Sequence, residues 1–392
     1  MKQSIVENRL KLIELDEYEE KLLPKVSKEV AAAINETGFI TVEPTFGEDS
    51  IFRADSKIGI VRVGDIQIKV MPKFPVNNLF YLLGLHDGIN FESDSVNIEE
   101  SRDITDLIFE SFLRNVLAST ARGLLTGYRR VEETSKVLHG RVLIGEQLKK
   151  RQGHMYPVEV AFDEFTDNIP ENIELNMAIS KAMKFGNLTP TQHRDFRHLS
   201  RRFSEIDTSK SNLHWTKSRH NSHYWNSLVL ADLINSGKGF YEELGGVAVS
   251  GFTVDMYRVF EKFLLRELKM RLESHGGVVE SKYLHLDEEN RQRAQVDIMW
   301  RRDGQIKFIA DAKYKDPATN WESALYQVNT YATAFSLDSI HLIYALPVDE
   351  APLRLKGNGP LVYRHGVDLS LDISAIRMEI DQLSATFLEK IH

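Results

Sequence analysis

The stretch "IKFIADAKYK" (306–315) has the composition of a buried β-strand but carries an aspartate and a lysine in its second half. Successive side chains of a strand point to opposite faces of a sheet. Ile309, Asp311 and Lys313 therefore share one face. The opposite face holds only uncharged side chains, which are Phe308, Ala310, Ala312 and Tyr314. A carboxylate beside an ammonium group in a core strand indicates a functional site; the alternative is a surface ion pair at an open sheet edge.

The sequence around this strand predicts the element order α-β-β-β-α-β. Amphipathic periodicity predicts a helix over 254–273. The triplet "RDG" (302–304) predicts a hairpin turn in front of the 306–315 strand. The remaining predicted elements are strands at 278–286 and 294–301, a helix over 320–336 and a fully apolar strand at 339–348.

Asp297 lies on the strand before the predicted turn, so its carboxylate can approach that of Asp311. Two neighbouring carboxylates repel each other unless they are protonated or bridged by a cation. Oxygen ligands on a rigid sheet suit Mg²⁺ or Mn²⁺. A lysine beside such a cation can orient a water and stabilise charge on a phosphate. Asp297, Asp311 and Lys313 together therefore indicate metal-dependent phosphodiester hydrolysis.

This region resembles the PD-(D/E)XK nuclease superfamily. The resemblance makes Asp297 the first acid, Asp311 the second and Lys313 the lysine of the motif. Val296 stands where the superfamily usually has proline, which is a variation that the superfamily tolerates.

The resemblance also implies two supporting residues. Some members add a glutamate from the first helix, and Glu261 is the candidate in this chain. Gln327 is similar to the polar residue often found on the second helix. The alternative for both side chains is an ordinary exposed helix surface.

The middle of the chain narrows the family. The motifs "LHGRVLIGEQL" (138–148), "VEVAFDEFTDNIPENIELNMAI" (158–179), "DAKYK" (311–315) and "YQVNTYA" (326–332) occur in the order found in McrC. McrC is the nuclease subunit of McrBC modification-dependent restriction systems, and the resemblance runs from residue 78 to the C-terminus. It implies a McrB-like AAA+ GTPase ring as partner, which carries the modified-base reader and binds the GTP. In agreement, no G-x-x-x-x-G-K-[ST] motif occurs in this chain.

Residues 123–145 are predicted to form a long β-hairpin with the polar turn "EETS". The family places a hairpin finger in the pore of the ring, and this segment matches it. The resemblance therefore implies that Arg129, Arg130 and Arg141 contact the partner near its GTPase sites. The alternatives for each arginine are contact with DNA phosphates or plain solvated charge.

The predicted fold class is a multidomain α+β and α/β protein. Its predicted parts are a β-rich N-terminal extension (1–77), a mostly helical McrC-like domain (78–250) that includes the hairpin, and a PD-(D/E)XK endonuclease domain (251–392). Within the N-terminal extension, residues 8–36 are expected to be helical. A turn-rich passage at 236–251 is the expected boundary between the second and third parts.

Composition limits the class of protein. The net charge is -8 and cysteine is absent, which excludes disulfides and thiolate metal sites. Two runs are nevertheless basic: 121–151 holds 8 basic against 3 acidic residues, and 193–220 holds 7 against 3. Either run alone is typical of a solvated helix face, whereas both together are compatible with binding to double-stranded DNA. No apolar run is long enough for a membrane helix, and a cytoplasmic location is expected.

These features predict a Mg²⁺-dependent DNA endonuclease subunit of a McrBC-like, GTP-dependent restriction system that cleaves modified, methylcytosine-type foreign DNA. One alternative is a PD-(D/E)XK endonuclease that needs no motor. A second alternative is a non-catalytic adaptor that only activates the partner GTPase. Retention of Asp297, Asp311 and Lys313 counts against the adaptor.

Overall fold

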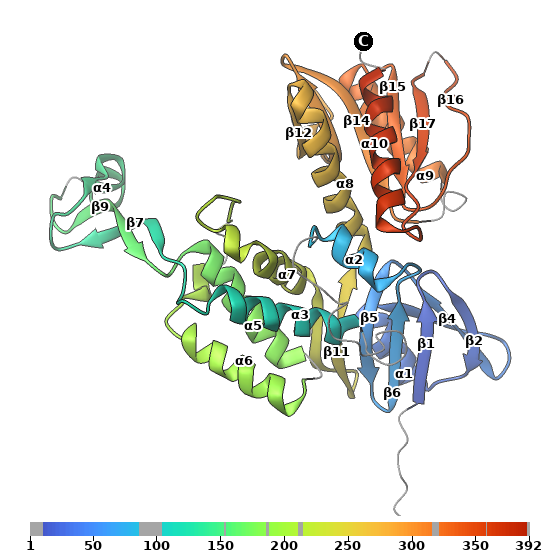
Figure 1. Ribbon diagram of the computed structural model, residues 1–392, viewed down its shortest axis with the longest axis horizontal. Helices are drawn as coiled ribbons and strands as arrows, with labels where there is room; N and C mark the ends of the chain where they lie inside the picture. The colour runs from blue at the N-terminus through green and yellow to red at the C-terminus, as the bar shows by residue number, and fades with distance from the viewer. Residues whose placement is uncertain are drawn as a thin grey trace, which may run out of the picture. The chain divides into compact units, whose positions relative to one another are not determined.

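The computed structural model describes residues 11–85, 104–152, 154–185, 188–210, 215–315, 321–357 and 359–389 (Figure 1). The chain forms two compact units. The first joins Met1–Ile104 to Phe240–His392, and the second is Thr105–Gly239. The predicted mixture of helices with several separate sheets is confirmed.

The N-terminal part of the first unit holds a five-stranded sheet. Its strands, in order across the sheet, are β1 (Lys11–Asp16), β6 (Ile66–Met71), β5 (Lys57–Val63), β11 (Val247–Asp255) and β10 (Lys238–Leu244). The passage 236–251, predicted to be turn-rich, therefore supplies two strands of this sheet. A second sheet combines β2 (Glu20–Pro24), β4 (Asp49–Ala54) and β3 (Ile40–Pro44), and both sheets share one apolar core with helix α1 (Lys28–Thr37).

The predicted helix over residues 8–36 is wrong for most of the part that the structure describes, which begins at residue 11. In β1 the buried side chains are Ile13 and Leu15, two positions apart, which is the period of a strand. Only the last third of the segment is helical. Ser27 caps the N-terminus of α1 through its side chain, and Gly38 ends the helix in the left-handed conformation.

The C-terminal part of the first unit follows the predicted order α-β-β-β-α-β. These elements are α8 (Met256–Leu272), β12 (Val278–His285), β13 (Arg293–Arg302), β14 (Gln305–Lys313), α9 (Trp321–Phe335) and β15 (Ser339–Tyr344). Three further elements follow, which are β16 (Leu353–Arg354), β17 (Leu361–Gly366) and α10 (Ile373–Glu389). The six strands form one sheet in the order β12-β13-β14-β15-β17-β16, and β14, β15 and β17 run parallel.

The two faces of this sheet are covered by different helices. Ile309 of β14 packs in one cluster with Val328 of α9, so the odd-numbered side chains of β14 face α9. Phe308 stacks on Phe387 of α10 with ring centroids 4.4 Å apart, so the even-numbered side chains face the opposite helix layer. In Figure 1, α10 lies in front of the sheet and α9 behind it.

The second unit combines helices with a small separate sheet. Its longer helices are α3 (Ile104–Ser119), α5 (Pro170–Phe185), α6 (Pro190–Arg202) and α7 (Trp225–Ser236). The small sheet has the order β7-β9-β8, with β7 (Gly127–Ser135), β9 (Val158–Thr166) and β8 (Arg141–Val142), and α4 (Ile144–Arg151) follows β8.

The predicted pairing within the hairpin 123–145 is wrong. All nine residues of β7 pair with β9, and only Arg141 and Val142 of the predicted second strand join the sheet, on the other edge of β9. Gly140 lies at the turn that precedes β8. It has a φ of 65°, and a Cβ there would lie 2.4 Å from the carbonyl oxygen of Ala161. The chain turns at Gly140 instead of continuing as a strand.

The close packing of a glycine in β11 leads to a prediction about the stability of the first unit. Gly251 has a φ of 151°, and a Cβ there would lie 2.2 Å from the carbonyl oxygen of Ile60 in β5. We expect Gly251→Ala to lower the free energy of unfolding of the first unit by about 2 kcal/mol or more, because both strain and a clash are introduced. Thermal unfolding of the full chain measures this.

Gly145→Ala is the matched control, because Gly145 lies in α4 with open space around its Cα. Alanine is the better helix former, so this change should leave the unfolding temperature equal or slightly higher. Equal unfolding temperatures for Gly251→Ala and the wild type would show that β11 and β5 do not approach as closely as described.

Candidate active site

The three residues singled out in the sequence come together where the middle of β13 lies beside the carboxyl end of β14. Ile298 pairs with Ala310 in the antiparallel register, so Asp297 lies opposite Asp311. Asp297 is held there by the backbone, since the amide of Ala312 donates a hydrogen bond to its Oδ2 at 3.0 Å. The hairpin register therefore places both carboxylates on the face of the sheet that α9 covers.

Burial gives these carboxylates unusual acidities. Asp311 is only 1% exposed, and burial raises its pKa although Lys313 opposes the shift. Burial, followed by the charges of Asp311 and Glu261, raises the pKa of Asp297 to about 8. Two ionised carboxylates in one desolvated place repel each other, so a further positive charge is needed before both can ionise at neutral pH.

Lys313 supplies one positive charge and is fixed by a chain of hydrogen bonds. It forms an ion pair with Asp311, and its Nζ donates to Oε1 of Gln327 at 3.0 Å. Nε2 of Gln327 donates to the hydroxyl of Tyr331 at 3.0 Å, and that hydroxyl donates to the carbonyl oxygen of Gln295 at 2.9 Å. The lysine is therefore positioned by α9 and by the strand that also carries Asp297.

Helix α8 brings a third carboxylate toward the pair. Asp255 caps the start of α8 by accepting from the amide of Tyr257. Glu261 lies one turn further along, and burial raises its pKa, with Asp311 adding to the shift. Burial also raises the pKa of the Tyr257 hydroxyl, with Asp297 and Asp311 the next causes. Glu261 and Tyr257 therefore share the electrostatic environment of the two aspartates.

The residues present fit a hard divalent cation. Among the described residues no group of three or more His, Cys, Asp and Glu side chains has the geometry of a complete metal site. Mg²⁺, however, is usually held by one or two carboxylates together with waters and substrate phosphates. Apart from its ion pair with Lys313, the Asp311 carboxylate finds no hydrogen-bond partner in the part of the chain that the structure describes. Asp297 and Asp311 would hold the cation, with Glu261 close by.

The arginines expected to contact a partner differ in their exposure and in the contacts that they already make within the chain. Arg129 of β7 is largely buried and bound, because it donates to the carbonyl oxygen of Asn168 at 3.0 Å and pairs with Glu164 at 3.2 Å. Arg130 is well exposed and pairs only with Glu132 among the described residues. Arg141 is exposed on β8. Arg130 and Arg141 are therefore available to a partner, whereas Arg129 stabilises the sheet.

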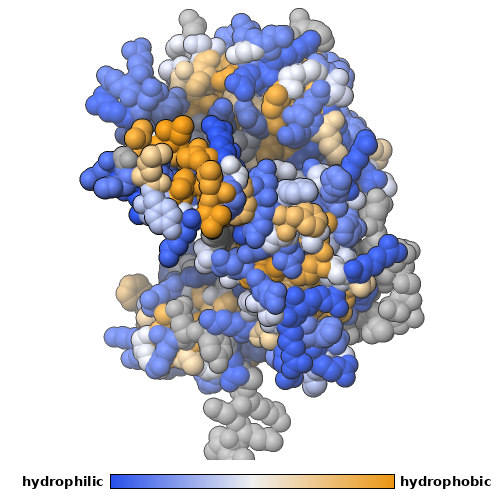
Figure 2. Space-filling view, turned by 90° about the vertical axis from the view of Figure 1, so that its left-hand side faces the viewer, coloured by the Kyte–Doolittle hydropathy of each residue, from blue (hydrophilic) through white to orange (hydrophobic). Residues whose placement is uncertain are grey.

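The β7-β9-β8 sheet and its neighbouring segments, residues 127–166, are rich in exposed apolar side chains. The large exposed ones are Tyr128, Val137, Leu138, Ile144, Leu148, Met155, Tyr156 and Phe165. Figure 2 is seen from the side of this sheet and shows apolar side chains gathered in a patch. Contiguous exposed apolar surface marks interaction sites in soluble proteins. We call residues 127–166 the docking sheet.

Two residues of the candidate site were not singled out from the sequence. Tyr331 follows Gln327 by four positions on α9, and Tyr257 precedes Glu261 by four on α8. Side chains four apart lie on the same helix face. That spacing was the available signal in both cases.

The sequence of the chain matches the model of one known protein family. The sequence model of the family described as "McrBC 5-methylcytosine restriction system component" matches residues 52–345. No protein with a curated description matches the chain.

Similar solved structures were also found. One is a refined half-complex from a tetradecameric assembly of Thermococcus gammatolerans McrB AAA+ hexamers with bound McrC; the match is 16% identical, covers 95% of this chain and 100% of that one, and has a TM-score of 0.49. A cryo-EM structure of the Thermococcus gammatolerans McrBC complex matches at 18% identity over 70% of this chain and 90% of that one, with a TM-score of 0.38. Protein VC1899 from Vibrio cholerae matches at 12% identity over 57% and 52%, with a TM-score of 0.25.

The helices that the structure describes include none with the length and apolar composition of a membrane span.

The raised pKa of Asp297 predicts how a cation changes stability. Its folded-state pKa of about 8 lies above the ordinary value of 3.8, so the folded state binds the extra proton and loses stability as pH rises toward 8. We expect Asp297→Asn to raise the unfolding temperature at pH 8 without divalent cations by a few degrees, since each kcal/mol shifts it by about 2–4 °C in a unit of this size. Millimolar Mg²⁺ should stabilise the wild type and not the variant.

Asp303→Asn is the control, because Asp303 lies exposed in the turn between the same two strands. Its response to Mg²⁺ should equal that of the wild type. Equal stabilisation of Asp297→Asn by Mg²⁺ would remove Asp297 from the metal site.

Proposed function

Because the chain belongs to the family of McrBC 5-methylcytosine restriction system components, we propose that it is the Mg²⁺-dependent DNA endonuclease subunit of such a system. Its substrate is modified, methylcytosine-type foreign DNA in the cytoplasm. The modified base is read, and GTP is hydrolysed, by an AAA+ partner. The superfamily fold proposed for the C-terminal part is PD-(D/E)XK.

One observation carries the nuclease proposal, which is the facing pair Asp297 and Asp311 with Lys313 fixed beside them. Burial raises the pKa of both carboxyl groups, and Lys313 offsets the shift of Asp311 only in part. Carboxyl groups whose pKa is shifted by burial and by a specific charged neighbour cluster at functional sites.

The chain's own residues have separate roles in the proposed reaction. Asp297 and Asp311 hold Mg²⁺, which supplies Lewis-acid stabilisation of the phosphate when bound. Lys313 presents its ammonium group to the attacking water and to the developing negative charge. Gln327 keeps the lysine in place, since its amide oxygen accepts from Nζ of Lys313. Burial raises the pKa of Glu261, which is placed beside the two aspartates and is suited to exchange a proton at the site.

Helix α6 offers a surface for the DNA backbone. Arg194, Arg197 and Arg201 are exposed and lie at positions i, i+3 and i+7, on one side of the helix. The net charge of -8 opposes long-range attraction. Binding by the chain alone is therefore expected to be weak and strongly dependent on salt.

The docking sheet is the proposed contact with the AAA+ partner. Family membership implies such a partner, and the chain has no G-x-x-x-x-G-K-[ST] motif of its own. The exposed apolar side chains of the docking sheet supply buried area on assembly, and Arg130 and Arg141 are available to act on the partner's nucleotide sites. This proposal replaces the hairpin 123–145 by the whole sheet as the docking element.

Cleavage tests the nuclease assignment. Asp311→Asn and Lys313→Ala should each lower the rate of DNA cleavage by the assembled system about 10³-fold or more, which corresponds to ~4 kcal/mol of lost transition-state stabilisation. Stimulation of GTP hydrolysis by the same variants should stay near the wild-type level. Lys307→Ala, on the same strand, is the control and should cleave normally. Wild-type cleavage by both site variants would refute the nuclease assignment.

GTP hydrolysis by the cognate AAA+ subunit tests the docking sheet. Leu138→Asp should weaken assembly at least about tenfold, because a charge then replaces an exposed apolar contact. Arg130→Ala combined with Arg141→Ala should lower the maximal stimulation at saturating chain concentration, since an arginine at the developing phosphate charge can contribute about 10³–10⁵ in rate in known GTPases. Arg122→Ala serves as the control. Unchanged maximal stimulation would show that these arginines do not activate the partner.

A further inference from the structure

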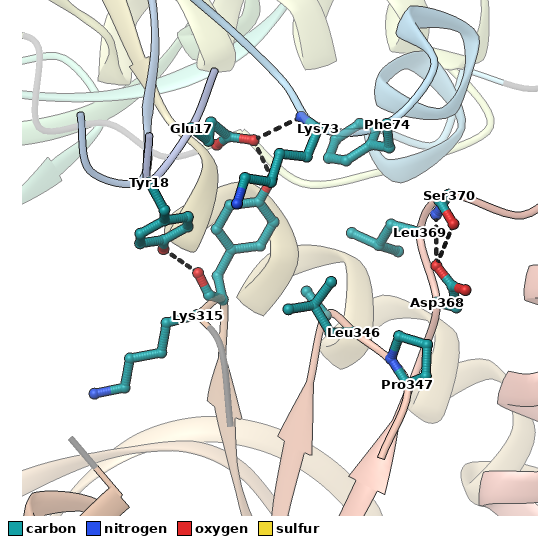
Figure 3. Close-up of a pocket in the computed structure, with 12 residues that line it drawn as sticks. Glu17, Tyr18, Lys73, Phe74, Lys315, Leu346, Pro347, Asp368, Leu369 and Ser370 are labelled. Atoms are coloured by element: carbon teal, nitrogen blue, oxygen red, sulfur yellow. Dashed lines mark hydrogen bonds between the residues drawn. The ribbon is translucent and has the colours of Figure 1, made fainter. Parts of the chain in front are cut away.

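A pocket of about 450 Å³ lies within the first unit at the carboxyl ends of parallel strands (Figure 3). One wall is formed by residues just past β14, β15 and β17, which are Tyr314–Lys315, Ala345–Pro347 and Asp368–Ser370. The opposite wall follows the carboxyl ends of the parallel strands β1 and β6, with Glu17–Tyr18 and Lys73–Phe74. Crevices at the carboxyl ends of parallel strands are the usual ligand sites of open sheets, and the volume is within the range of about 300–1,000 Å³ of such sites.

A buried carboxyl group stands at this pocket. Glu17 is 1% exposed, and its Oε2 accepts from the hydroxyl of Tyr314 at 2.8 Å and from the amide of Lys73 at 3.2 Å. Its Oε1 is buried and has no hydrogen-bond partner among the described residues. Burial raises the pKa of Glu17 to about 8, so the carboxyl is mostly protonated at neutral pH. Because Oε2 already accepts two hydrogen bonds, the acid proton belongs on Oε1, where it lacks an acceptor.

The rest of the lining combines apolar and cationic groups. Figure 3 shows Phe74, Leu346 and Leu369 around one space, which makes an apolar wall suited to a flat ring. Nζ of Lys73 lies 5.6 Å from the centre of the Tyr18 ring. The lining also includes the acid Asp368, whose Oδ1 accepts from both the amide and the hydroxyl of Ser370.

We propose that this pocket binds a single nucleotide. The base lies against the wall of Phe74 and Leu346, an acceptor atom of the base accepts a hydrogen bond from the Glu17 carboxyl, and the phosphate lies near Lys73. The nucleotide is either free or the unpaired terminal nucleotide of a DNA strand. Binding in this pocket does not depend on cleavage, so it goes beyond the proposed function and is tested separately.

Titration calorimetry of the full chain in EDTA tests the proposal without cleavage. The probes are 5′-dCMP, 5′-dAMP, deoxycytidine and inorganic phosphate. We expect saturable one-to-one binding of at least one nucleotide, and weaker binding of both the nucleoside and phosphate. Lys73→Ala should weaken nucleotide binding about tenfold and leave nucleoside binding nearly unchanged. Lys25→Ala, an exposed lysine on the same unit, is the control.

Leu346→Trp should abolish nucleotide binding because the larger side chain fills the pocket. Its unfolding temperature is measured in parallel, and Lys73→Ala keeps the test valid if Leu346→Trp does not fold. Absence of saturable nucleotide binding overturns the proposal. So does inorganic phosphate binding as tightly as a nucleotide, or a folded Leu346→Trp with wild-type affinity.

Fluorescence anisotropy with labelled duplexes identifies the source of the nucleotide. If Lys73→Ala weakens binding of a duplex with a three-nucleotide single-stranded overhang but not of a blunt duplex, the pocket binds a DNA end. If both duplexes are unaffected while free nucleotide binding falls, the pocket binds a free nucleotide. Asp311→Asn should retain nucleotide binding in either case, which separates failure of this proposal from failure of the nuclease assignment.

Discussion

The repulsion between Asp297 and Asp311 is the constraint on which the C-terminal part of the first unit depends. Two carboxylates are held opposite each other on antiparallel strands, and desolvation raises the pKa of both. An arrangement of this kind persists only when the surrounding structure fixes it. The backbone amide of Ala312 holds one carboxylate, and the ion pair with Lys313 holds the other.

This site can be predicted from the sequence because its charged residues stand in an apolar strand, where side chains alternate between the two faces. Asp311 and Lys313 interrupt an otherwise apolar run two positions apart, and one turn signal at 302–304 fixed the register that brings Asp297 opposite. The N-terminal segment had no such marker. Ile13 and Leu15 alternate over too few residues to stand out against the charged residues around them, so the sequence pattern predicts a helix where the structure has a strand. The strand pairing of the docking sheet is mispredicted for another reason. Residues 127–135 pair with residues 158–166, which are distant along the chain, and no turn signal specifies this pairing.

Strand β11 shows why the borders of the first unit are hard to find in a sequence. It pairs with β5 from Val249 to Asp255, almost two hundred residues away along the chain. The same Asp255 caps α8, the helix that carries Glu261. The N-terminal sheet and the candidate active site are thus joined by a strand and a helix that follow each other without a linker. A composition change can mark a linker, but it cannot reveal a segment that belongs to a distant sheet.

The end of β14 connects two environments that the alternation of strand side chains keeps apart. Lys313 points toward α9 and Gln327, whereas the next residue, Tyr314, donates to Glu17 in the turn after β1. Tyr18 contacts the backbone of the same residue, because its hydroxyl donates to the carbonyl oxygen of Tyr314. Consecutive residues share one peptide unit, which is planar and stiff. A shift of the Tyr314 backbone therefore also shifts the peptide unit that it shares with Lys313. Through the hydrogen bond from Tyr18 to this backbone, the N-terminal part of the chain contributes to the geometry of the candidate active site.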